Sequence, residues 1–183
     1  MDEHQLFDNV TRWLNHEGYE YSKDNVEKLF HIKKDETLFL KKIKNYYGVH
    51  IFEPKEQKGI LVIGIEIKIP GSIHKSYHES YVENDKKNLM ANLENFAMGM
   101  GAIHRFYPDP NAIKSGVYIV LDSKQKLNFE SFMESMKKIV IMEDSMNTFL
   151  NNLKGSKGAG DGKPSQSSWV TRWGSKWQDV GSI

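Results

Sequence analysis

The chain has 183 residues, 39% hydrophobic and 27% charged, which is ordinary for a single globular domain. Its 25 basic and 24 acidic side chains nearly cancel, so there is no overall basic excess to attract nucleic acid and no acidic excess to suggest a solvating tail. Cysteine is absent, so disulfides and thiolate metal sites are excluded. No apolar run reaches the roughly 18 residues of a membrane helix, and residues 1–5 are acidic and polar, unlike a signal peptide. We therefore expect a cytoplasmic protein without a membrane span.

The first half of the chain combines one predicted helix with several predicted strands. Apolar residues at helical spacing predict a helix that starts near Asp2 or Glu3 and ends at Gly18. The strands predicted after this helix cover residues 29–33, 37–40, 46–52 and 60–69. A turn at residues 34–36 is expected between the first two strands.

The predicted strand at 60–69 has the clearest pattern in the chain. In its second half, isoleucines alternate with Gly64, Glu66 and Lys68. Because successive side chains of a strand point to opposite faces, this half should show one face to a core and the other to water.

The second half of the chain is predicted to be mostly helical. Ser72 is the expected cap of a helix that runs to about residue 100, loosened or broken in the polar run 83–88. Gly99 and Gly101 mark its end. The remaining predicted elements are strands at 103–107 and 116–121, joined by a proline-containing loop at 108–111, and a long helix at 127–153.

The order of elements is therefore α-βββ-α-ββ-α, with three strands or more in the first group. Consecutive strands joined by short loops predict an antiparallel sheet with helices on one face, an α+β fold. This body covers residues 1–153. Residues 154–168 are rich in Gly, Ser and Lys and predict a flexible linker to a Trp-rich peptide, residues 169–183. Residues 154–183 carry a net charge of +3, which leaves −2 for the body.

Two histidines are the candidates for a metal site. His74 and His78 stand four residues apart on a predicted helix, a spacing that places both imidazoles on one face. The zinc-protease motif requires Glu directly after the first histidine, and Lys75 stands there instead. Since no third ligand is evident, solvent-exposed helix histidines are the favoured interpretation, and no metal is predicted.

Motifs of catalysis and cofactor binding are missing from the sequence. There is no Gly-x-Ser-x-Gly nucleophile elbow, and the Gly-Lys of residues 162–163 is followed by Pro164 rather than Ser or Thr, so it is not a phosphate loop. We expect a protein that is not an enzyme and that needs no cofactor.

The C-terminal peptide carries the most distinctive pattern. Trp169, Trp173 and Trp177 repeat every four residues, and Val180 continues their line with Arg172 nearby. Tryptophan is a favoured anchor of interfaces, so these residues predict a segment that docks in a hydrophobic groove of a protein or peptide partner, of a second copy, or of its own body. Two alternatives stay open. The basic aromatic peptide could bind nucleic acid or another anionic surface, or it could be appended to a protein of unknown function.

Residues 5–153 resemble an uncharacterised archaeal family whose fold is like that of type III secretion chaperones. The resemblance rests on the element order and on residues 10–18 (VTRWLNHEG), 62–69 (VIGIEIKI) and 106–109 (FYPD). It implies a compact α+β domain that binds extended peptides or partner chains, often as a dimer, and it implies no catalytic activity. The leading hypothesis is thus a chaperone-like or adaptor-like interaction module.

Overall fold

The computed structural model describes residues 5–24, 28–29, 32–43, 46–108, 113–125 and 127–156. Within these ranges the elements are, in chain order, α1 (Gln5–His16), β1 (Tyr21–Asp24), β2 (Lys28–Leu29), β3 (Ile32–Ile43), β4 (Tyr46–Pro54), β5 (Ile60–Ile67), α2 (Gly71–Glu79), α3 (Glu83–Gly99), β6 (Ile103–Pro108), β7 (Ile113–Asp122) and α4 (Phe129–Ser156). The predicted linker and the Trp-rich peptide lie outside the described residues, apart from the end of α4, which continues to Ser156.

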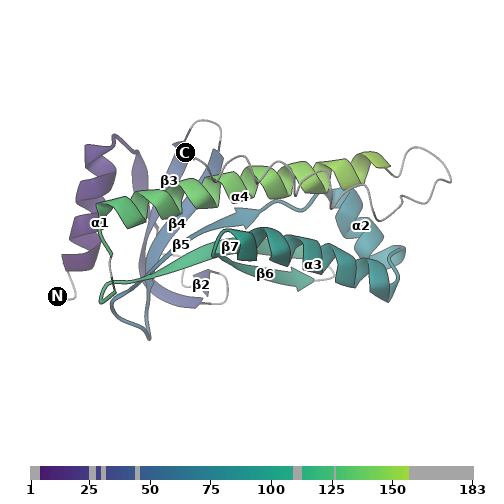
Figure 1. Ribbon diagram of the computed structural model, residues 1–183, viewed down its shortest axis with the longest axis horizontal. Coiled ribbons are helices and arrows are strands. Elements are labelled where there is room, and N and C mark those ends of the chain that lie inside the picture. The colour runs from purple at the N-terminus through teal and green to yellow at the C-terminus, as the bar shows by residue number, and fades with distance from the viewer. Residues whose placement is uncertain are drawn as a thin grey trace.

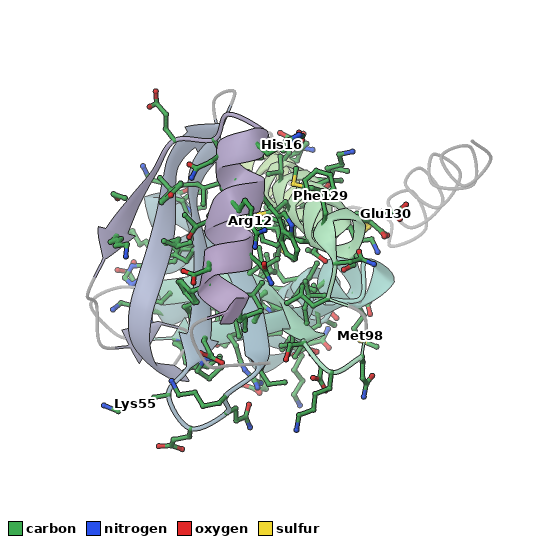
Figure 2. The ribbon with its side chains drawn as sticks, turned by 90° about the vertical axis from the view of Figure 1, so that its left-hand side faces the viewer. Arg12, His16, Lys55, Met98, Phe129 and Glu130 are labelled. Carbon is green, nitrogen blue, oxygen red and sulfur yellow. The ribbon has the colours of Figure 1, made fainter. Side chains whose placement is uncertain are left out.

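The strands form one antiparallel sheet in the order β1-β3-β4-β5-β7-β6, and β2 pairs with β3 beside it (Figure 1). At the centre, Ile63 of β5 aligns with Ile51 of β4 and Ile119 of β7. The helices lie together on one face of the sheet, and α4 runs along its length from the side of α1 to the side of α2 (Figures 1 and 2). The predicted α+β architecture is confirmed, and five strands precede the middle helices, within the predicted three or more.

The core fills the layer between the sheet and the helices. Along β5, alternate side chains point to this layer, and all four are buried: Leu61, Ile63, Ile65 and Ile67. The buried residues of α4 recur at helical spacing and pack against the same layer: Phe132, Met136, Ile139, Met142, Met146 and Leu150. These two periodicities come directly from the sequence, so the core face of each element is set by its own apolar pattern.

An aromatic contact joins the two helices that meet at one end of the molecule. The Trp13 ring of α1 lies 5.4 Å from the Phe132 ring and 6.4 Å from the Phe129 ring of α4, between ring centroids. Figure 2 shows Phe129 beside His16, whose ring lies 5.9 Å away. Aromatic pairs at such distances add packing energy to the burial of their surfaces.

The predicted helix 72–100 is two helices. The break falls at residues 80–82, just before the polar run, and that run forms the first turns of α3. Glu83 and Asp85 in the first turn of α3 favour a helix start there, because carboxylates are stabilised near helix N-termini. Pro70, not Ser72, occupies the N-cap of α2. Its carbonyl oxygen accepts hydrogen bonds from the N–H groups of Ile73 and His74. Proline suits this place because it needs no N–H donor.

The predicted turn at 34–36 is wrong, because β3 continues through it. Lys34 pairs with Pro54 and Thr37 pairs with Phe52, so β3 advances three residues while β4 advances two. The extra residue in β3 shifts the register, which reverses the face to which the following side chains point. A bulge inside a strand and a turn between strands both interrupt the hydrophobic alternation, which is why the sequence pattern did not separate them.

Two smaller predictions at chain turns have different outcomes. Gly18 ends α1 with φ of +72°, and the N–H of Tyr19 donates to the Leu14 carbonyl oxygen, as the sequence predicted for the residue just past the helix. The predicted loop at 108–111 falls mostly outside the described residues, since 109–112 are not described.

The turn between β4 and β5 is held by hydrogen bonds that depend on one glycine. Gly59 has φ of +82°, its N–H donates to the buried carboxylate of Glu53, and its carbonyl oxygen accepts from the N–H of Ser123 at 2.8 Å. A β-carbon added at Gly59 would lie 2.9 Å from the Ser123 Oγ. The turn therefore requires glycine for both its backbone conformation and its close neighbour.

Substitution Gly59→Ala should lower the free energy of unfolding by about 2 kcal/mol, from the strained positive φ and the contact with Ser123. Chemical denaturation measures this change. Gly71→Ala is the matched control, because Gly71 has no positive φ and nothing lies within 4 Å of its added β-carbon. Equal stability of the two variants would contradict the assigned role of Gly59.

Candidate functional site

The face of the sheet opposite the helices, which we call the open face, carries its own apolar cluster. Phe52 of β4, Val62 of β5 and Tyr118 of β7 are buried there, and Ile32 and Ile60 pack against them. The register explains the cluster, because Val62 aligns with both Phe52 and Val120 across its two neighbouring strands. Such cross-strand neighbours contact one another on the same face. In the part of the chain that the structure describes, no helix packs on this cluster (Figure 2).

Beside this cluster the open face is hollowed. The hollow has a volume of about 460 Å³, within the range of ligand pockets. Six apolar side chains line it, namely Ile32, Ile60, Val62, Ile103, Tyr118 and Val120. They come from four different strands, so the pairing of the sheet is what assembles the hollow.

The β4–β5 turn forms the polar rim of the hollow. Pro54, Glu56 and Gln57 line it at this end. The Glu53–Gly59 hydrogen bond closes the turn behind them, and the Lys58 Nζ lies 3.8 Å from the other Glu53 carboxylate oxygen. The rim therefore offers a carboxylate and a carboxamide next to an apolar floor, the combination of few polar groups and many apolar ones that orients a bound segment.

Two apolar side chains of the hollow remain substantially exposed. Ile103 on β6 is 40% exposed and Val120 on β7 is 43% exposed. Covering the remainder of each would contribute about 1 kcal/mol. Ile103 aligns with Tyr118, whose ring is 4% exposed, so the exposed side chains continue a buried cluster rather than standing alone. Contiguous exposed apolar surface of this kind makes the hollow a candidate interaction site.

The residues predicted to dock a partner are not among those described. Trp169, Trp173, Trp177, Arg172 and Val180 all lie outside the described residues. Their docking role, the alternative of nucleic-acid or anionic-surface binding, and the alternative of an appended peptide stay predictions.

The two candidate metal ligands lie side by side on α2 without a third. The His74 and His78 rings are 4.9 Å apart between centroids, and the Tyr77 ring lies 5.4 Å from that of His78. No group of three or more His, Cys, Asp or Glu side chains with metal-binding geometry occurs among the described residues. The two imidazoles lie close together, as the spacing predicted. His78 is exposed but His74 is half-buried, so the favoured interpretation of two solvent-exposed histidines is wrong for His74. The described surroundings supply no further ligand.

A third histidine, on β6, sits in the layer between sheet and helices. His104 is 8% exposed, and its Nε2 lies 2.9 Å from the Oγ of the buried Ser115 on β7. Burial, together with the neighbouring Arg105, lowers the pKa of His104 from 6.5 to about 4. A neutral histidine hydrogen-bonded to serine resembles a nucleophile and its base, but both side chains are covered, so substrate has no access to the pair as it stands.

Sequence reasoning missed the hollow, although the sequence contains a signal for it. Residues 117–121 and 60–63 are uninterrupted apolar runs rather than alternating ones. Such runs indicate strands with both faces covered. In this fold the second face is the open face, so the runs point to the apolar cluster of Val62, Tyr118 and Val120.

Comparison with known proteins supports the fold. A family described as an uncharacterized conserved protein, DUF2299, matches residues 6–150, and no curated protein matches. The crystal structure of an uncharacterized protein from Methanothermobacter thermautotrophicus is similar with a TM-score of 0.63 at 10% identity, covering 79% of this chain and 96% of that one. YbjN of E. coli, a candidate transcription regulator, is similar with a TM-score of 0.50 at 15% identity, covering 78% and 92%. At such identities these likenesses show a shared fold alone. No described helix has the length and apolar character to cross a bilayer.

The lowered pKa of His104 predicts a specific loss of stability in acid. The unfolded chain takes up this proton near pH 6.5 and the folded chain only near 4, so the contribution of His104 is complete above 6.5 and is lost as the pH falls towards 4. His104→Gln, which retains a partner for Ser115, should remove on the order of 2 kcal/mol of this pH dependence. Denaturation at a series of pH values measures it, with His16→Gln, at an exposed site, as the control. An unchanged pH profile in His104→Gln would contradict the assignment.

Proposed function

We propose that this chain, which belongs to the DUF2299 family of uncharacterized conserved proteins, is a non-catalytic interaction domain that holds an apolar segment of another protein in the hollow of its open face. The observation that carries the proposal is the continuity between the buried cluster of Phe52, Val62 and Tyr118 and the exposed side chains of Ile103 and Val120. Water contacts these two side chains at the edge of an apolar surface, so a segment that covers them is stabilised by the hydrophobic effect.

The segment that fits is apolar or aromatic. Seven of the nine lining residues, Pro54 included, present hydrocarbon or aromatic surface. The two polar ones, Glu56 and Gln57, stand at the rim. Aromatic side chains bring a large apolar area, and those of Tyr and Trp also carry a donor, for which Glu56 and Gln57 supply acceptors. The chaperone-like fold that the sequence resembles agrees with such a role, because secretion-type chaperones hold segments of other chains. The proposal includes an adaptor role and the formation of a homodimer through the same face.

An array of short unstructured peptides tests this function with the full chain. Peptides rich in Leu, Phe and Trp should bind, and Val120→Asp should weaken their binding at least about tenfold, because it places a charge in the apolar hollow. Ile141→Asp is the matched control: Ile141 is 45% exposed, close to the 43% of Val120, but it lies on α4. Equal loss of binding in both variants, or no preference for apolar peptides, would contradict the proposal.

The rival function, binding of nucleic acid or an anionic surface through the basic peptide, makes a different prediction. Phosphate contacts release counterions, so such binding weakens steeply with added salt. The affinity of apolar peptides for the hollow should change little, or increase, as salt is added. Repeating the array measurement from low to high salt therefore separates the two functions.

A further inference from the structure

We infer that the hollow of the open face is occupied by this chain's own Trp-rich segment, residues 169–183, which competes with partner segments for the same surface. The inference rests on the proposed function in using the same docking surface. It adds the identity of an occupant and a regulatory consequence, because a segment bound within the chain lowers the affinity for every external peptide.

The chemistry of the segment matches that of the hollow. The chain has four tryptophans, and three of them are Trp169, Trp173 and Trp177. Tryptophan needs a large apolar surface together with an acceptor for its indole N–H. The hollow supplies the surface through side chains such as Val62 and Val120 and the acceptors at its rim.

The length of the chain outside the described structure allows the segment to reach the hollow. α4 has 28 residues and is therefore about 42 Å long. Thirteen residues lead from Ser156 to Trp169, and extended they span up to about 45 Å, enough to run back along the whole of α4. Trp173 and Trp177 have a further four and eight residues, which can span about 14 and 28 Å more. That exceeds the roughly 10 Å thickness of a packed layer around which the segment must pass.

Tethering and charge both favour the chain's own segment over a free peptide. A segment joined to its binding surface by a short stretch of chain has an effective concentration in the millimolar range, so even weak contacts suffice for occupancy. Residues 154–183 carry a net charge of +3 and the body −2. Opposite net charges assist the approach of the segment, although exposed charges contribute little to its affinity.

Quenching of tryptophan fluorescence by acrylamide in the full chain tests the inference. The Trp169→Ser, Trp173→Ser, Trp177→Ser variant retains only Trp13 and supplies the background to subtract. After this subtraction the signal comes from Trp169, Trp173 and Trp177. These three indoles should be shielded from acrylamide in the parent chain. They should be quenched at least about twofold more strongly in Val120→Asp, with no change in Ile141→Asp. Equal quenching in all three proteins would overturn the inference. If Val120→Asp does not fold, as judged by circular dichroism, Ile103→Ser takes its place.

Two further measurements distinguish the occupant. Shielding that disappears on dilution, with a doubled mass by light scattering, would identify a second copy as the occupant and overturn the intramolecular inference. In the peptide array, the triple Trp→Ser variant should bind apolar peptides about tenfold more tightly than the parent chain. Equal binding by the two would leave the proposed function standing and overturn self-docking, whereas absence of binding by both would overturn the proposed function itself.

Discussion

The pairing of β5 with β4 on one side and β7 on the other is the constraint on which the molecule depends. It aligns Ile63 with Ile51 and Ile119 under the helices, and by the same register it aligns Val62 with Phe52 and Val120 on the opposite face. Because successive side chains of a strand point to opposite faces, a register that aligns the residues of one face also aligns those of the other. Because the helices that the structure describes all lie on one side, the alignment that builds the core also leaves a second apolar surface on the other.

The elements that the sequence predicts well are those whose pattern is local. The alternation along β5 and the helical stripe of α4 depend on nearest neighbours, and both are as expected. The continuity of β3 depends instead on a tertiary contact, its pairing with the partner strand β4. The hollow was out of reach for the same reason, since its lining comes from strands as far apart in sequence as those of Ile32 and Val120.

The histidines show that spacing in the sequence does not reveal which side chain has an unusual environment. His74 and His78 attract attention by their spacing, and they do lie together on α2. His104, with no motif around it, has the more unusual environment, because its neighbour Ser115 comes from the paired strand and its burial from the helices above. Environment of this kind arises only on folding. Among the described residues, the strongly perturbed His104 therefore lies in the layer between sheet and helices, away from the exposed apolar surface of the open face.

The extra residue of β3 between Lys34 and Thr37 has a consequence for the hollow. Leu38 lies six positions after Ile32, an even number, so the two would share a face in a regular strand. Instead, Leu38 lies under the helices, while Ile32 forms part of the wall of the hollow. Without this extra residue, Ile32 and Leu38 would point to the same face, and the hollow would lose one of its walls. The hollow therefore depends on the length of β3 as well as on the identity of its lining side chains.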